Sequence, residues 1–502
     1  MNWLDWSVIF IYLVMVIGIA LWVMQRQKTI HDYYLAGRQV RWWQSGLSTM
    51  ATQLGAISFV SAPAFVALKE NGGFKWLSYE FGVPLGLIAV MWIIIPTLHR
   101  RNVISIYEYL EDRFDASTRL SVSLLFQVGR ALASSVAVLA GGIILSSALS
   151  ISTVSAIILV GVATIVYDVL GGIRVVILSD VFQMVIIVSG LVICGVTAAG
   201  FVTWEDAVIL MSAERLEILD MKHWGMSPEG EYGFWPMLLG GIFLYASYYG
   251  CDQSQVQREL TVGSVDGVKK SLLFNAIGRF PLVLLYCILG ILVGAVVLSP
   301  GGMERVGASL GADAGAAKEV LMRDPDRMVP LFVLSYLPHG LIGFVFVAIM
   351  AALMSSLDSA LNSLSAVTIR DIYERYFGKI TKEKRRLFLS KVCTLSWGVF
   401  CVVTACALSM SGEATRQTTI VLINAVGSLI YGPILAVFMV GMCTRVADYR
   451  WVNVGAASGL ALNLCLWLFT PVSWLWWNVF GFATAFLIPL GADVVGGGGK
   501  RG

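Results

Sequence analysis

Charged residues are scarce in this 502-residue chain, since aspartate, glutamate, lysine and arginine together make up only 13% of it. Soluble proteins typically carry about 25%. The chain is also 57% hydrophobic and has a mean hydropathy of +0.78. This composition excludes an ordinary soluble domain and predicts an integral membrane protein, in which the length of each apolar segment is the main signal.

Paired cysteines, clustered histidines and catalytic motifs are missing as well. The eight cysteines form no CxxC pair and lie mostly in apolar runs, where we expect small buried hydrophobic residues without disulfides. The four histidines are scattered without metal-ligand spacing. No phosphate-binding loop, serine-hydrolase elbow or nucleophile–base set stands out. We therefore expect no enzyme activity, no nucleic-acid partner and no obligate protein partner.

Apolar segments of about the 20 residues that a membrane crossing needs recur along the chain. Thirteen candidates cover residues 3–25, 42–68, 74–97, 119–148, 151–170, 174–202, 234–253, 269–298, 330–366, 387–411, 417–440, 451–470 and 473–494. The first is not expected to be a cleaved signal, because MNWLDWS has an acid, no basic residue and no small-residue cleavage site after it. The expected fold is all-α, with about 13 transmembrane helices.

Lysine and arginine are distributed unevenly among the loops. If the N-terminus is outside, the cytoplasmic loops hold 24 of the 35 basic residues, Arg258 among them, and the outer loops hold nine. Arg130 and Arg279 fall within spans. The positive-inside rule then predicts an outer N-terminus and a cytoplasmic C-terminus. We expect a multi-pass protein of the plasma membrane, which is the inner membrane in a Gram-negative bacterium.

Two spans are interrupted by glycine, proline or polar residues. The second, WWQSGLSTMATQLGAISFVSAPAFVA, contains a polar string, and the seventh, GFWPMLLGGIFLYASYYGCDQSQ, contains Gly240, Gly241 and Gly250. They lie five spans apart and run in opposite directions. Such a pair indicates an inverted-repeat secondary transporter, whose unwound backbone lines a cavity and offers carbonyl oxygens to a cation. At any single glycine, close helix packing is the alternative.

The stretch ALMSSLDSALNS, residues 352–363, is polar inside an apolar run. At helical spacing Ser355, Ser359 and Ser363 share one face, and Ala352 and Ser356 flank it. Asp358 and Asn362 form an adjacent stripe. Hydroxyl and carbonyl oxygens suit a monovalent cation. Serines that only pack or bond back to the helix explain one or two of these residues. An intramembrane acid costs about 2.5–3.5 kcal/mol on insertion scales, so Asp358 needs a partner or a function.

Motifs along nearly the whole chain resemble those of the solute:sodium symporters, a family that includes bacterial sialic acid and sugar transporters. They are YYLAGRQVRWWQSGLS, YEYLEDRF at 107–114, GGIRVVILSDVFQ at 171–183, DQSQVQRE at 252–259, and AALMSSLDSALNSLSAV followed by RDIY. YEYLEDRFDASTRL and FQVGR are most similar to the sialic acid branch. The resemblance implies a five-plus-five inverted-repeat core with broken helices, like that of the leucine transporter.

This fold implies a single transporter domain over residues 1–502. Residues 1–41 would be a leading helix and loop, 42–440 the core with repeats at about 42–202 and 234–440, and 441–502 the trailing helices and tail.

The resemblance also implies sites for Na+, as one or two ions. The site common to the family would use the backbone oxygens of Ala51, Leu54 and Ala352 and the hydroxyls of Ser355 and Ser356. A second cation site, found in some members, would use Asp180, Ser355, Asp358 and Ser359. Related transporters carry serine or threonine at the position of Asp358. Either this acid makes the site hold its cation more tightly, or it is protonated or paired elsewhere.

The family pattern places substrate contacts at Gly55, Ser58, Trp76, Glu80, Arg130 and Tyr248. In sialic acid transporters an arginine of the fourth span holds the carboxylate, and Arg130 matches it; a guanidinium stays charged and offers a bidentate fork. The alternative is a structural arginine paired with an acid such as Glu80, or with a carbonyl. Gly55 lacks the hydroxyl of sialic acid carriers, and Glu80 stands where they have an amide. Arg279, near the inner end of its span, is expected to snorkel or pack.

The expected function is sodium-coupled symport of an organic solute by alternating access, with a carboxylate-bearing sugar such as sialic acid as substrate. A neutral sugar or a small monocarboxylate is the alternative within the class. A channel or receptor on a similar bundle is the alternative from another class. A channel needs a continuous polar lining, whereas the polar residues here cluster at midplane and inner depth.

Overall fold

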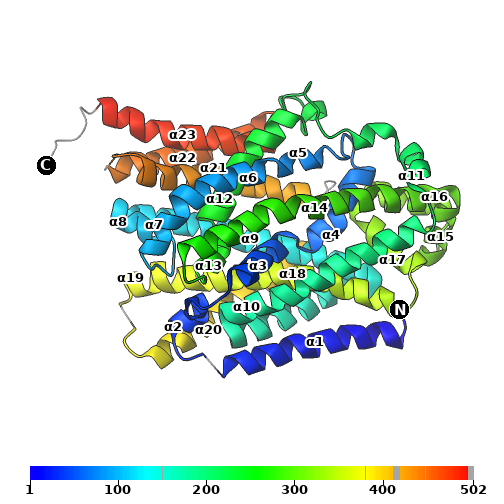
Figure 1. Ribbon diagram of the computed structural model, residues 1–502, viewed down its shortest axis with the longest axis horizontal. Helices are drawn as coiled ribbons and strands as arrows, with labels where there is room; N and C mark the ends of the chain where they lie inside the picture. The colour runs from blue at the N-terminus through cyan, green and yellow to red at the C-terminus, as the bar shows by residue number, and fades with distance from the viewer. Residues whose placement is uncertain (26, 150, 379, 411–418, 447, 496–502) are drawn as a thin grey trace.

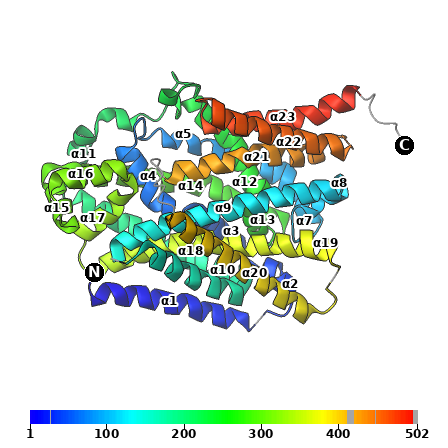
Figure 2. The ribbon, with the colours of Figure 1, turned by 180° about the vertical axis from the view of Figure 1, so that it is seen from behind.

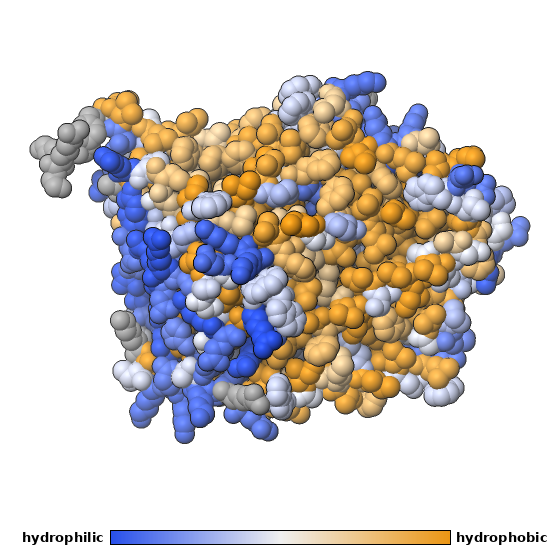
Figure 3. Space-filling model, in the orientation of Figure 1, coloured by the Kyte–Doolittle hydropathy of each residue, from blue (hydrophilic) through white to orange (hydrophobic). Residues whose placement is uncertain are grey.

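The computed structural model is all-helical over the residues it describes, which are 1–495 except 26, 150, 379, 411–418 and 447. Its helices run side by side, and the start of α1 (Trp3–Met24) and the end of α23 (Trp474–Val495) lie at opposite ends of the molecule (Figures 1 and 2). On the face that Figure 3 shows, apolar side chains cover the middle and polar ones gather at the two ends. This distribution fits a protein that spans a bilayer.

Ten helical segments in the described part of the chain are long and apolar enough to cross a membrane, and a bent helix pair adds an eleventh. The segments are α1, α5 to α7 (Trp76–Glu80, Gly82–Ala89, Ile95–Arg100), α9 (Ala116–Leu149), α10 (Thr153–Ala199), α14 (Val265–Leu298), α18 (Leu341–Val367) with α19 (Glu374–Tyr376), α20 (Glu383–Met410), α21 (Thr419–Cys443), α22 (Tyr449–Phe469) and α23. Shorter helices include α2 (Ile30–Leu35), α8 (Glu108–Arg113), α11 (Trp204–Met211), α15 (Pro300–Leu310) and α16 (Ala314–Arg323). The count of thirteen spans stays a prediction.

The second predicted span is the bent pair, and it breaks within its polar string. α3 (Trp42–Gln53) and α4 (Ala56–Leu68) meet at an angle of 55°. Between them, Leu54 has φ −88° and ψ 47°, and Gly55 is extended at φ −61° and ψ 173°. The last carbonyls of α3 therefore lack the partners that a continuous helix would supply, and they can serve a ligand.

The seventh predicted span is also broken, although its glycines are not the cause. α12 (Gly241–Cys251) stays helical to its end, and the break lies at Asp252, whose φ of −90° and ψ of 118° are extended. α13 (Gln253–Glu259) follows at once. Gly241 serves close packing, because a Cβ there would lie 3.1 Å from the ring and the carbonyl of Tyr79. The interruption thus sits C-terminal to the glycines that indicated it.

The fifth and sixth predicted spans form one element, α10, which is interrupted at Gly172. Its φ of 54° and ψ of −162° belong to a region that glycine alone adopts readily. Tyr167, before the break, donates a hydrogen bond to Asp358 of α18. Asp180, after the break, contacts Arg258, which also contacts Ser359 of α18. In an unbroken helix the Cα atoms of Tyr167 and Asp180 would be about 20 Å apart along the axis. The chain therefore turns back at Gly172, as two separate spans require.

The ninth predicted span, 330–366, is wrong in its outer part, where two helices replace one. α17 (Met328–Tyr336) ends before a proline, and Gly340, with φ 89°, precedes α18. Buried Asp5 of α1 accepts the N–H groups of Gly340 at 2.7 Å and Gly343 at 3.0 Å. A carboxylate thus pairs N–H groups at the start of α18, which stabilises a helix beginning there.

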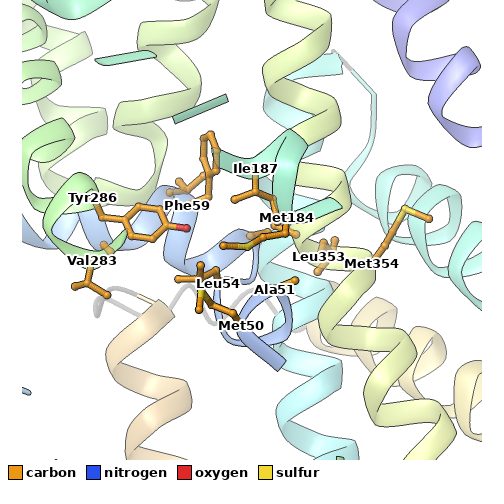
Figure 4. Close-up of a cluster of buried hydrophobic side chains, with 14 of the residues drawn as sticks. Met50, Ala51, Leu54, Phe59, Met184, Ile187, Val283, Tyr286, Leu353 and Met354 are labelled. Carbon is orange, nitrogen blue, oxygen red and sulfur yellow. The ribbon is translucent and has the colours of Figure 1, made fainter. Parts of the chain in front are cut away.

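α18 lies at the centre of the molecule, packed against α1, α9, α10 and α20, and nearly all its side chains are buried. Figure 4 shows the apolar side chains around the break of the second span, which come from α3, α4, α10, α14 and α18. They are Met50, Ala51, Leu54, Phe59, Met184, Ile187, Val283, Tyr286, Leu353 and Met354. This close packing holds the unwound backbone against α18.

Candidate functional site

A cavity of about 350 Å³ lies beside the two broken spans. Its lining includes all six positions at which the sequence predicts substrate contact: Gly55, Ser58, Trp76, Glu80, Arg130 and Tyr248. It also includes residues that the sequence analysis did not assign to substrate, among them Gln53, Tyr245, Asp252, Arg279 and Tyr431. A space of this size suits a small organic molecule. The six residues thus share one cavity, and their contact with a substrate stays a prediction.

Arg130 reaches the cavity from α9 and is incompletely paired. Its side chain is 11% exposed, and its Nη1 lies 3.7 Å from Oδ2 of Asp252. The Nε has no hydrogen-bond partner among the described residues, and the ring of Tyr248 lies 5.9 Å from the guanidinium carbon. Because 3.7 Å is longer than a hydrogen bond, this guanidinium keeps donors available for an anionic group. The nearest acid is Asp252 rather than Glu80, and the alternative of a structural arginine paired with an acid stays a prediction.

Glu80 pairs with Arg279 instead. The Nε of Arg279 lies 2.5 Å from Oε2 of Glu80, and its Nη2 lies 3.2 Å from Oε1 and 2.7 Å from the Tyr245 hydroxyl. Its Nη1 donates to the Gln53 side chain. The expectation that Arg279 snorkels or packs is wrong, because residue 279 lies about 20 Å along α14 from its first residue. That depth is readable from the sequence and was the missed signal.

The residues predicted for the common sodium site converge where α3 ends against α18. The Ser355 hydroxyl lies 3.3 Å from the Ala51 carbonyl oxygen and 3.0 Å from that of Ala352. The Ser356 hydroxyl lies 3.2 Å from the same Ala352 oxygen and 3.0 Å from the Thr52 carbonyl oxygen. The arrangement gathers hydroxyl and carbonyl oxygens, the ligand type that a small monovalent cation prefers.

Leu54 and Gly55 complete this region. Leu54 occupies the break itself, so its carbonyl belongs to the unwound segment. Gly55 lets that segment approach α18, because a Cβ on Gly55 would lie 2.6 Å from the hydroxyl oxygen of Ser356. The absence of a side chain at Gly55, which the sequence analysis noted as a departure from sialic acid carriers, therefore has a local steric reason.

The residues predicted for the second cation site also come together, with an arginine among them. Asp180, Ser355, Asp358 and Ser359 are all at most 1% exposed. The Asp358 Oδ1 lies 3.0 Å from the Ser359 hydroxyl, and its Oδ2 accepts a hydrogen bond from Tyr167. Asp358 thus has neutral hydrogen-bond partners, and a buried acid needs a partner or a function.

Arg258 supplies the positive charge of this cluster. Its Nη2 lies 3.2 Å from Oδ2 of Asp180 and donates to the Ser359 hydroxyl, and its Nε lies 2.8 Å from the Ser48 hydroxyl. The Ser48 hydroxyl also donates to Asp180 at 2.5 Å. The assignment of Arg258 to a cytoplasmic loop is wrong, because its side chain is fully buried. Its motif, DQSQVQRE, is too polar for hydropathy to place inside the protein.

Comparison with known proteins places the chain. Residues 33–450 match the sodium:solute symporter family. The sodium/sialic acid symporter NanT of Aliivibrio fischeri is 30% identical over 95% of this chain and 90% of its own. The sodium/sialic acid symporter SiaT of Proteus mirabilis is 26% identical over 96% of this chain and 92% of its own. A sodium-coupled sialic acid symporter solved in a substrate-bound, outward-open state has the same fold, with a TM-score of 0.87, 23% identity and 98% coverage of both chains.

The fold and the oxygen-lined break define a membrane transporter. The chain belongs to the sodium:solute symporter family, and it is a sodium-coupled symporter of an organic solute. The family is one of transporters, not of catalytic enzymes.

Proposed function

We propose that this symporter carries sialic acid, or a closely related carboxylate-bearing sugar, together with sodium. The observation that carries the proposal is Arg130, a buried guanidinium with an unpartnered Nε in a cavity beside the broken second span. Such a group binds a carboxylate through charge-assisted hydrogen bonds. The NanT and SiaT relatives, which are sialic acid symporters by name, support the same substrate.

Sodium would bind first at the common site, through Ala51, Leu54, Ala352, Ser355 and Ser356. A second sodium would bind at Asp180, Ser355, Asp358 and Ser359, where Arg258 would have to withdraw to make room. The convergence of these oxygens around the break supports both sites. One ion or two can therefore be coupled to each substrate molecule, depending on the position of Arg258.

Transport would follow alternating access between two inverted repeats, at about 42–202 and 234–440. The breaks at Leu54 and Asp252 support this division, because each repeat holds one broken helix at the cavity. The basic loops support an outer N-terminus and a cytoplasmic C-terminus in the plasma membrane, with an odd number of crossings. In this orientation sodium enters down its gradient and drives inward movement of the solute.

A neutral sugar is the alternative substrate, and one observation favours it. The cavity holds two arginines and two acids in the pairs Arg130–Asp252 and Arg279–Glu80, so its charges balance without a ligand. A balanced cavity accepts a neutral polyol without leaving a charge unpaired. A small monocarboxylate would use Arg130 alone and leave most of the cavity empty.

Uptake by purified protein in proteoliposomes separates these substrates. Radiolabelled sialic acid, glucose, galactose and lactate are offered with an inward sodium gradient and with potassium in its place. We expect sialic acid uptake only with sodium, and competition by other sugar acids. Sodium-driven uptake of a neutral sugar without uptake of sialic acid would contradict the proposal.

A further inference from the structure

Asp252 belongs both to the cavity and to the break of the seventh span. Its Oδ1 accepts the Ser254 N–H at 2.8 Å and the Ser254 hydroxyl at 2.6 Å, which caps α13. Its Oδ2 lies 3.4 Å from the Tyr431 hydroxyl and 3.7 Å from Nη1 of Arg130. The side chain is only 2% exposed. One carboxylate therefore ties the extended residue between α12 and α13 to α9 and α21.

The Arg130–Asp252 pair is looser than the other ion pair of the cavity. Arg279 makes contacts of 2.5 and 3.2 Å with Glu80, whereas Arg130 makes a single contact of 3.7 Å with Asp252. An anionic ligand would therefore compete for Arg130, where fewer donors are engaged. A carboxylate bound to Arg130 would approach Asp252, and two like charges in a buried site repel each other strongly.

We propose that Asp252 is an internal counter-ion that the substrate carboxylate displaces from Arg130, and that this exchange releases the break of the seventh span from α9. The proposal rests on the anionic substrate of the proposed function. The displaced carboxylate has partners at hand, because the Tyr431 hydroxyl and the capping Ser254 already contact it. Without substrate, the contact between Asp252 and Arg130 would hold the break of the seventh span against α9. With substrate bound, Arg130 would contact the substrate carboxylate in place of Asp252.

α13 carries this exchange toward the sodium region. The helix has seven residues, with Asp252 at its N-cap and Arg258 in its last turn. Arg258 contacts Asp180 and Ser359, both residues of the proposed second cation site. Because a short helix moves as a rigid unit, a shift at Asp252 changes the position of Arg258. Substrate binding would then alter the affinity of the second site, which is a coupling between two distinct sites.

The test is the substitution Asp252→Asn, which removes the charge and keeps a good N-cap residue. Purified full-length protein is titrated with sialic acid and, separately, with its methyl ester, both in sodium buffer. We expect the variant to bind sialic acid about tenfold more tightly than the wild type, a change of roughly 1.4 kcal/mol. Binding of the uncharged ester should change little, because it does not compete with a carboxylate for Arg130.

Two further variants separate charge from structure. Ser254→Ala removes one hydrogen bond to Asp252 without altering any charge, so it should not tighten sialic acid binding. Asp252→Glu keeps the charge on a longer arm and should weaken it, which gives a second readout if Asp252→Asn is poorly folded. Wild-type protein that binds no sialic acid would overturn the proposed function and this inference together. Wild-type protein that binds it, with an Asp252→Asn variant no tighter, would overturn this inference alone.

Discussion

Arg258 of α13 and Asp180 of α10 form an ion pair in which neither side chain is exposed to solvent, with Nη2 3.2 Å from Oδ2. The same guanidinium contacts the Ser359 hydroxyl, so it lies at the site proposed for a second sodium ion. A cation and a guanidinium cannot both neutralise Asp180 at that position. A second sodium ion could therefore bind at the proposed site only if Arg258 moved aside during the transport cycle.

Asp180→Asn should change the ratio of charge to substrate transported. If Asp180 holds a second sodium, the ratio falls by one charge per substrate in the variant, because one ion is lost. Current and radiolabelled flux are measured together in proteoliposomes, with a sodium Hill coefficient as a second readout. A wild-type ratio consistent with one sodium, unchanged in Asp180→Asn, would contradict the second site.

The same variant should unfold more easily, because it leaves Arg258 buried without its counter-charge. Removal of one partner from a buried ion pair costs about 3–5 kcal/mol. Thermal unfolding in detergent measures the loss. The matched control is Asp112→Asn, at the solvent-exposed Arg101–Asp112 pair, which should shift stability by at most about 1 kcal/mol.

Ser355→Ala and Ser356→Ala should each raise the sodium concentration that gives half-maximal uptake. Both hydroxyls belong to α18 and contact the last carbonyls of α3, so their loss would remove ligands of the proposed common site while α18 remains intact. Ser355→Ala should impair coupling more than Ser359→Ala, because Ser355 would serve both sites. Uptake that is the same in sodium-free buffer as in sodium would refute the common site.

Arg130→Lys should weaken binding of sialic acid although it keeps the charge. A lysine loses the bidentate fork, and one charge-assisted hydrogen bond is worth about 1.5–3 kcal/mol, or roughly 10- to 150-fold in affinity. The comparison variant is Arg101→Lys, at an exposed ion pair that does not line the cavity. Equal affinities in Arg130→Lys and the wild type would remove Arg130 from the binding site.

Gly172→Ala should destabilise the protein, because φ of 54° with ψ of −162° is strained for any other residue and a Cβ would lie 2.6 Å from Tyr33. We expect a loss of about 1–3 kcal/mol from the backbone alone. Gly195→Ala in the same helix is the matched control, since its nearest neighbour would be 4.0 Å away. Similar melting temperatures for the two variants would show that the turn at Gly172 tolerates a side chain.

Local patterns predicted those parts of the fold whose cause is local. The polar string of the second span predicted that this span is interrupted, and the structure has the break at Leu54. The family motif predicted that the hydroxyls of Ser355 and Ser356 face this break, and both contact carbonyls of α3. The ninth span was misjudged because the apolar residues on both sides outweighed a local break signal, Pro338 and Gly340, at its outer boundary. The carboxylate that satisfies the start of α18 comes from Asp5, more than 330 residues earlier, and no local pattern contains it.

The partners of the buried charges lie far from them in the sequence, so local patterns did not predict these pairs. The resemblance to the family assigned Arg130 and Glu80 to the substrate site, and a charge inside a span is costly and requires a role. Their partners, Asp252 and Arg279, could not be assigned, because either arginine could have faced either acid. Arg258 was placed outside the membrane, because hydropathy averages over a segment and does not register a polar helix enclosed by other helices.

The sequence by itself determined the membrane class through its composition, and it determined the family through motifs that are each local in the chain. Those motifs also carried the proposed sodium ligands. The tertiary structure alone decided which charges meet: Arg258 with Asp180, Arg279 with Glu80, and Arg130 loosely with Asp252. The physical reason is that a buried charge is stabilised by groups within a few ångströms of it, whatever their distance along the chain. Only the packing of α5, α9, α10, α13 and α14 around the broken spans sets those distances.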